Sequence, residues 1–145
     1  MNYNRQYSPQ RPNPPETSNV DEKRIEKILG GDAFELNKYA EELAQFYIKG
    51  GRNEALSTSQ IRTILTEIQK MKEFNPTQLQ LLRPKLAYAA GRQGPKAKIR
   101  EFRHLLEVLI KKTNKDNFAN FKNFVEAIVA YHKYHGSKQG GNNGE

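Results

Sequence analysis

The sequence predicts an all-α fold, a single small bundle of five or six helices. Apolar residues recur at three- and four-residue spacing in several segments, which is the period of one buried helix face. Asp, Ser or Asn precedes most of these segments, and Gly or Pro follows them, as at helix starts and stops. No segment alternates apolar and polar residues for long enough to predict a strand.

The two ends of the chain differ in composition from the middle. Residues 1–19 hold four of the seven prolines among Asn, Gln and Ser, and residues 137–145 are rich in Gly. Neither segment has enough apolar surface to offset the entropy lost on ordering. We therefore expect a disordered Pro/Asn-rich arm over residues 1–19, a helical bundle domain over residues 20–136 and a disordered tail over residues 137–145.

Two helices are predicted first along the chain. Asp21 can cap a short helix that ends near Leu29, before a Gly-Gly pair. Asp32 can cap the next helix, which should run to Lys49 before a second Gly-Gly pair. We expect the apolar side of this second helix to consist of Phe34, Tyr39, Leu43, Phe46 and Tyr47.

A capping box predicts the start of the third helix. Ser57 is followed three residues later by Gln60, so that hydroxyl and amide can satisfy backbone donors reciprocally. We expect a long helix, from Ser57 to about Glu73, because Asn75-Pro76 is the first stop signal. Its buried stripe is predicted to be Ile61, Ile64, Leu65, Ile68 and Met71.

Three more helices complete the predicted bundle. The fourth directs Leu79, Leu82, Leu86 and Ala89 or Ala90 inward, and Pro84 predicts a kink or a new helix start within it. The fifth should begin with Pro95 in its first turn, and the sixth near Asn117. Gly136 is expected to end the sixth helix in the left-handed conformation. The predicted core residues of these two helices are Ile99, Phe102, Leu105, Leu106, Leu109, Phe118, Phe121, Val125, Ile128 and Val129.

Composition excludes several classes of protein. The chain has no cysteine, so disulfide frameworks, thiolate nucleophiles and cysteine metal sites are absent. The N-terminus lacks the apolar region of a secretory signal, and no apolar run approaches the roughly 20 residues that span a bilayer. We therefore expect a soluble cytoplasmic protein with no membrane partner.

The net charge of +8 is concentrated in the C-terminal half. Residues 20–73 hold nine basic and ten acidic side chains, whereas residues 74–145 hold thirteen and five. An asymmetric positive field attracts polyanions through long-range attraction and counterion release, although a basic surface also serves solubility. The imbalance favours a nucleic-acid partner.

The window from Phe74 to Arg100 contains no acidic residue. On the fourth helix Lys85, Tyr88 and Arg92 share one outward stripe, and on the fifth a second stripe carries basic residues. We expect the two stripes to meet at one corner of the bundle, where cations neutralise phosphates and the Tyr88 ring stacks on a base. The second stripe and the turn before it contribute Lys96, Lys98, Arg100 and Arg103.

Catalytic chemistry has little support in the sequence. The three histidines are His104, His132 and His135, and the last two are interpreted as a partly exposed pair at a helix end. No third metal ligand stands nearby and no glycine-rich phosphate loop is present, so we expect no metal, no cofactor and no enzymatic activity.

Three motifs closely resemble the small subunit of the type III-A CRISPR effector, the Csm complex. They are LSTSQIR at residues 56–62, LLRPKLAYAAGR at residues 81–92 and FKNFVEAIVAYHKYHG at residues 121–136. The resemblance covers residues 56–136 in the order and spacing of the family, and its most distinctive part is the last motif. The two helices before it match only in general character, and residues 1–19 are not expected of the family.

The resemblance implies a non-catalytic, all-helical subunit that takes part in antiviral defence. Several copies would stack into an inner filament against guide RNA and target RNA, beside the backbone subunits and the large polymerase-like subunit. By motif position it implies that Arg62, Arg83, Lys85 and Arg92 contact RNA, whereas Tyr131 and Phe124 pack. The charge pattern alone adds Lys96, Lys98, Arg100, Arg103 and the ring of Tyr88.

Two alternatives from other classes stay open at this point. One is a DNA-binding helix-turn-helix regulator, which needs two short helices joined by a tight turn; a helix of the predicted length from Ser57 to Glu73 disfavours it. The other is a small histidine-dependent ribonuclease. A homodimer of the isolated chain is also expected, because the aromatic-rich last helix and the other apolar helix sides exceed the needs of one core.

Overall fold

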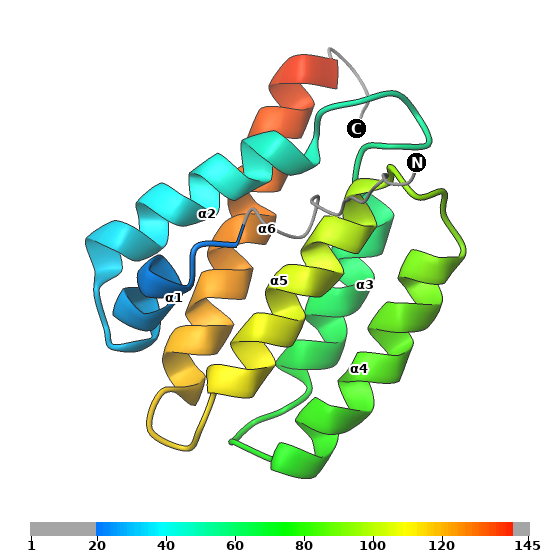
Figure 1. Ribbon diagram of the computed structural model, residues 1–145. Coiled ribbons are helices and arrows are strands. Elements are labelled where there is room, and N and C mark those ends of the chain that lie inside the picture. The colour runs from blue at the N-terminus through cyan, green and yellow to red at the C-terminus, as the bar shows by residue number, and fades with distance from the viewer. Residues whose placement is uncertain (1–19, 141–145) are drawn as a thin grey trace, which may run out of the picture.

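Six helices make up residues 20–140, the part of the chain that this computed structural model describes (Figure 1). They are α1 (Glu22–Leu29), α2 (Ala33–Tyr47), α3 (Thr58–Gln69), α4 (Pro76–Gly91), α5 (Lys98–Lys112) and α6 (Phe118–Gly140). No strand occurs within these residues, which confirms the predicted all-α fold. The predicted arm and residues 141–145 of the predicted tail lie outside the described part.

Side-chain caps start the first four helices, as the sequence indicates for three of them. Asp21 and Asp32 accept hydrogen bonds from the backbone amides three residues ahead, at 3.2 and 2.9 Å. At α3 both halves of the capping box form, because the Ser57 hydroxyl accepts from the Gln60 amide and the Gln60 side chain accepts from the Ser57 amide. Asn75, expected only as a stop signal, caps α4.

The C-terminal ends of three helices differ from the prediction. Helix α2 ends at Tyr47 and not at Lys49. Helix α3 ends at Gln69, earlier than the predicted Glu73, because the chain turns inward to bury Met71, whose carbonyl accepts a hydrogen bond from the Lys122 amine at 2.9 Å. Helix α6 continues through Gly136 to Gly140, so the predicted left-handed stop at Gly136 is wrong.

Two prolines, Pro84 and Pro95, occupy different positions relative to their helices. Pro84 lies inside α4, which continues through it as one helix and does not restart there. Pro95 lies in the turn before α5, not in its first helical turn, and Ala97 occupies the N-cap position without a side-chain hydrogen bond. Lys96 consequently lies in the α4–α5 loop and not on the helix.

The core forms where α6 packs against α1, α2 and α3, with α5 beside them. Four α6 side chains, Phe121, Phe124, Val125 and Ile128, are completely buried. The Phe124 ring stacks on Tyr39 of α2 with 5.9 Å between centroids, and Tyr47 meets Phe102 of α5 edge-on at 5.4 Å. Burying one such ring stabilises the fold by about 1.5–3 kcal/mol, so the aromatic residues of α6 contribute strongly to the core.

One predicted core residue is exposed, and one expected surface is buried. Phe34, at the start of α2, has 91% of its surface in solvent, because the first turn of α2 extends past the helices that it packs on. The aromatic face of α6, expected to be available for self-association, packs inside through Phe118, Phe121 and Phe124. No helix of the described residues is long and apolar enough to span a bilayer.

His132 is a core residue, so its interpretation as partly exposed is wrong. Only 3% of its surface is accessible, and its Nε2 donates to the Leu56 carbonyl at 2.7 Å. The other ring nitrogen, Nδ1, is buried without a partner. Burial disfavours the imidazolium and lowers the pKa of His132 below its ordinary value of 6.5, and the hydrogen bond to Leu56 opposes this effect in part.

This burial predicts that acid destabilises the fold. Because the pKa of His132 is lower in the folded chain than the 6.5 of an unfolded one, the unfolded state binds the proton more readily. The contribution is fully present above the unfolded pKa and is lost as the pH falls. We expect the free energy of unfolding, measured by urea denaturation, to decrease between about pH 7 and pH 5.

In His132→Gln this part of the pH dependence should disappear, although the variant itself loses stability. His104→Gln, which changes a half-buried histidine of α5, serves as the matched control and should keep the parent slope. Parallel pH profiles for the parent and His132→Gln would contradict the assignment.

Candidate nucleic-acid interface

Helix α4 lies at the edge of the bundle, beside α3 and α5 (Figure 1). Its inner side buries Leu79, Leu82, Leu86 and Ala90. Its outer side carries four exposed residues at helical spacing, which are Leu81, Lys85, Tyr88 and Arg92. Leu81 and Tyr88 are 59% and 72% exposed, so this stripe combines basic charge with apolar surface that the fold does not cover.

A groove of about 320 Å³ runs between α3 and α4. Lys85 and Arg92 line it from α4, and the hydroxyl residues Ser59 and Thr63 line it from α3. Arg62 lies in a shallow neighbouring depression that shares Ser59 and Thr63 with this groove. Cations and hydroxyls are the groups that most often contact the phosphates and sugars of nucleic acids.

The loop between α4 and α5 extends this basic surface. Arg100 holds the loop from inside, because its guanidinium donates to the carbonyls of Gly94 at 3.0 Å and Gln93 at 3.2 Å. Lys96 stands exposed on the same loop, without an ion pair among the described residues. We use the name α3–α4 basic face for the surface formed by Arg62, Lys85, Tyr88, Arg92 and Lys96.

The other predicted RNA contacts have partners within the fold. Arg83 donates to Glu107 of α5 at 2.7 Å, and Arg103 lies 3.5 Å from the same carboxylate. The Lys98 amine lies over the ring of Phe46, 5.0 Å from its centroid, and therefore faces α2. Of the nine predicted residues, Lys85 and Arg92 thus line one groove with Arg62 beside it, whereas Arg83, Lys98, Arg100 and Arg103 contact other parts of the chain.

The acid-free window of the sequence is not acid-free in space. Glu67 of α3 pairs with Lys85, and Glu107 of α5 pairs with Arg83. Both carboxylates belong to helices that flank α4. Helix α4 therefore forms an ion pair with a neighbouring helix on each side. The partners are far apart in the sequence, so the sequence did not indicate these pairs.

Sequence reasoning missed the polar face of α3. Ser59, Thr63 and Thr66 recur at three- and four-residue spacing, so they share a side of the helix with Arg62. The hydroxyls of Thr63 and Thr66 donate to backbone carbonyls one turn earlier, which leaves their oxygens able to accept. The period of the hydroxyl residues in STSQIRTILT was the signal available in the sequence.

The histidines do not assemble a site. His132 is buried against Leu56, whereas His135 contacts Glu41 of α2 at 2.7 Å. Among residues 20–140 no group of three His, Cys, Asp or Glu side chains could hold a metal ion. Charged and hydroxyl groups of α3 and α4 line the two adjoining depressions described above.

The Arg100 contacts predict a structural role for this residue. Arg100→Gln should lower the free energy of unfolding by about 1 kcal/mol, because two carbonyls of the loop lose a charged donor. Urea denaturation measures this change, and amide hydrogen exchange should speed up over residues 92–97. The exposed neighbour provides the control, since Lys96→Gln should stay within about 0.5 kcal/mol of the parent. Equal stability of the two variants would contradict the role.

The comparison with protein families identifies the chain. The family model described as Csm2 Type III-A matches residues 31–138, which includes α2 to most of α6 and begins well before the motifs at residues 56–136. No curated protein and no solved structure matches the chain. The match spans more than half of the sequence and confirms the resemblance that the motifs indicated, so the chain belongs to the Csm2 family and is a small subunit of the type III-A CRISPR Csm complex in antiviral defence.

Proposed function

We propose that the chain is a non-catalytic RNA-binding subunit whose α3–α4 basic face holds the backbone of guide RNA and target RNA. The observation that carries this proposal is the convergence of Lys85, Arg92 and hydroxyl residues on one groove, with Arg62 beside it. Phosphates need cations and accept hydrogen bonds, and the hydroxyls of RNA sugars can also donate to hydroxyl oxygens of the protein. A groove with this lining binds backbone and shape, and reads no base sequence.

Tyr88 gives this face a second kind of contact. Its ring is largely exposed, and the Arg92 guanidinium lies 5.8 Å from the ring centroid. Exposed aromatic rings beside cations are platforms on which unstacked bases pack, at about 1–3 kcal/mol per base. Such stacking tolerates any base, which agrees with a surface that follows RNA of varying sequence.

Membership of the complex also implies protein partners. We propose that several copies stack along the RNA and contact the backbone subunits and the large polymerase-like subunit. Phe34 and Tyr134 are exposed aromatic residues outside the α3–α4 basic face, and they offer anchors for such contacts. Weak RNA binding by one copy becomes strong when copies are held in a row, because later contacts are then intramolecular.

The two alternative functions have less support. In a helix-turn-helix, a turn of three or four residues joins the two helices. Six residues, 70–75, separate α3 from α4, and the tight connection of residues 30–32 joins α1 and α2, which are not part of the α3–α4 basic face. Helix α3 has only 12 residues, so its length does not disfavour a helix-turn-helix. A histidine-dependent ribonuclease needs an accessible acid and base, and His132 is buried.

The RNA proposal predicts a salt-dependent affinity with little base preference. We expect one subunit to contact about three phosphates. A plot of the logarithm of the association constant against the logarithm of the salt concentration should then have a slope near −2. Replacing Arg62, Arg92 and Lys96 together by Gln should weaken binding and bring the slope toward zero. Fluorescence anisotropy with labelled RNA over a salt series measures both quantities. Lys85 is retained in this variant because it pairs with Glu67.

A variant of Lys23, Lys38 and Lys49 is the matched control. These three lysines are exposed on α1, on α2 and just after α2, so their replacement by Gln removes the same charge from another part of the surface. The control should bind RNA more tightly than the first variant, and both should melt near the parent. Equal binding by both variants, or a preference of about tenfold between unrelated RNAs, would refute the assigned face. Tighter binding to duplex DNA than to RNA would favour the regulator.

Absence of catalysis is a separate prediction. Labelled RNA incubated with the purified chain should stay intact with and without divalent metal ions, because no acid-base pair is assembled at the α3–α4 basic face. Gel electrophoresis over a time course provides the measurement, and a Lys23 variant prepared in parallel controls for contaminating nuclease. Cleavage that follows the parent protein and disappears in His104→Gln or His132→Gln would establish the ribonuclease alternative.

A further inference from the structure

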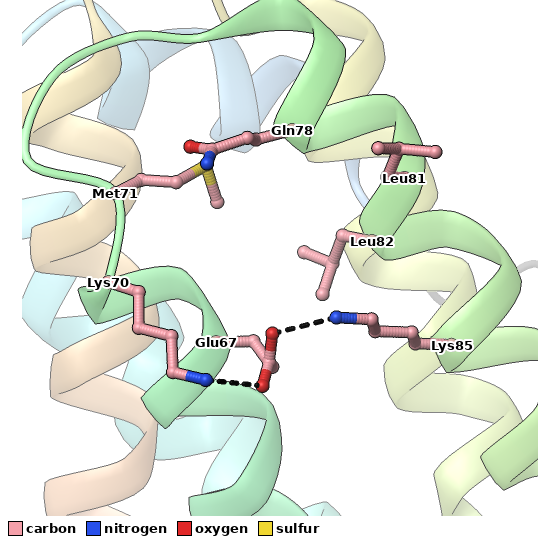
Figure 2. A pocket seen from close by; sticks show the side chains of 7 residues that line it. All are labelled: Glu67, Lys70, Met71, Gln78, Leu81, Leu82 and Lys85. Carbon is pink, nitrogen blue, oxygen red and sulfur yellow. Dashed lines mark hydrogen bonds and ion pairs between the residues drawn. The ribbon is translucent and has the colours of Figure 1, made fainter.

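The Glu67 carboxylate lies between two lysine amines at one end of the α3–α4 groove (Figure 2). Its Oε2 accepts from Lys70 at 3.1 Å, and its Oε1 accepts from Lys85 at 2.9 Å. Lys70 follows α3 and Lys85 belongs to α4, so the contact bridges two elements. The pocket around them has a volume of about 200 Å³ and is otherwise lined by Met71, Gln78, Leu81 and Leu82.

This geometry is that of an anion site with an internal occupant. Figure 2 shows both lysine side chains directed at the one carboxylate, with open space between α3 and α4 beside it. The hydrogen bond from Lys85, and to a smaller extent the one from Lys70, lowers the pKa of Glu67, which keeps the carboxylate ionised at neutral pH. If the Glu67 carboxylate moves away, another anion can bind to the amines of Lys70 and Lys85 in its place.

The carboxylate is weakly held. The side chains of Lys70 and Lys85 are 67% and 64% exposed, and exposed ion pairs contribute about 0–1 kcal/mol. The Glu67 side chain is itself 29% exposed, and it has a flexible stem. An RNA phosphate, backed by neighbouring phosphates and released counterions, competes favourably for such lysines.

We propose that Lys70 and Lys85 form a phosphate subsite of the α3–α4 basic face, which the Glu67 carboxylate occupies until an RNA phosphate displaces it. The inference rests on the proposed RNA-binding function and adds Lys70, which lies outside the acid-free window, to the contact surface. The subsite is continuous with the larger groove, because Glu67 and Lys85 line both pockets. Glu67 thereby lowers the affinity of each copy for RNA.

The other bridging carboxylate of this region differs from Glu67. Glu107 of α5 pairs with Arg83 and Arg103, but its side chain is only 16% exposed, against 29% for Glu67. The Nε atom of Arg103 is buried without a hydrogen-bond partner, so part of the Arg103–Glu107 ion pair lies away from solvent. Displacement of Glu107 would therefore cost more desolvation than displacement of Glu67.

The test is the removal of the internal anion in the full-length chain. Glu67→Gln keeps the shape of the side chain and removes its charge, so it should bind labelled single-stranded RNA about twofold to fivefold more tightly than the parent. The salt slope should become steeper by about 0.7, which is the share of one further phosphate contact on a single strand. Melting curves verify that the variant is folded.

Two further variants separate the subsite from a general effect of charge. Glu26→Gln is the matched control, because Glu26 and Glu22 of α1 share the Lys112 amine of α5 at 3.1 and 3.2 Å, so Glu26 is also an exposed carboxylate in an ion pair between two helices. It changes the net charge equally, far from the groove, and should leave the RNA affinity nearly unchanged. In the double variant Glu67→Gln, Lys70→Gln the gain in affinity and in slope should be lost.

The outcomes distinguish this inference from the function on which it rests. If Glu67→Gln binds RNA no more tightly than the parent, or no more tightly than Glu26→Gln, the subsite is wrong while the α3–α4 basic face stands. If the parent binds no RNA at low salt, both fail. If labelled polyglutamate binds the parent more tightly than RNA does and responds to the same substitutions, the two lysines receive a protein carboxylate, and the RNA subsite is overturned.

Discussion

The structure depends on the burial of one aromatic helix face. Helix α6 places Phe118, Phe121 and Phe124 in the interior, and rings from α2 and from the segment before α4 pack on them. Each ring removes a large apolar area from water, which is the dominant favourable contribution to folding. Because this face occupies the centre, α1, α2, α3 and α5 arrange themselves around it.

The position of α4 follows from that arrangement. It has no place beside α6 and packs mainly on α5 and α3, with only one side buried (Figure 1). An edge helix keeps a full stripe in solvent, and here that stripe carries Lys85, Tyr88 and Arg92. The same packing that completes the core thus supplies an exposed basic helix and a groove at its side. A small subunit of the Csm complex gains its proposed contact surface from an edge helix of its fold.

Local electrostatics divide the basic residues into two groups. Arg83 and Arg100 bind a carboxylate and loop carbonyls, and so stabilise the surroundings of α4 and the loop after it. Arg62 and Lys96 have no ion pair within the described residues and increase the positive potential of the surface. Lys85 belongs to both groups, since it bridges to Glu67 and also lines the groove. Total charge therefore overstates the number of cations available to a polyanion.

The sequence by itself determined the helices, the caps of the first three and most of the core. Caps such as Ser57 with Gln60 act within one turn, and apolar residues at helical spacing define a buried side locally, so both can be read without knowledge of the fold. The motifs also indicated the family, which the match over residues 31–138 confirmed. The exposed position of Tyr88 follows from the same periodicity.

Only the tertiary structure decided the rest. Helix α3 ends early because Met71 and Lys122 meet, and His132 is buried because Leu56 offers a carbonyl, although 51 and 76 residues separate these partners in the chain. The window from Phe74 to Arg100 lacks acids in sequence, yet Glu67 and Glu107 reach it from neighbouring helices. Periodicity fixes which side of a helix is apolar, but the charges that a side chain meets are fixed by packing between helices, because electrostatic and hydrogen-bond partners are selected by distance in space and not along the chain.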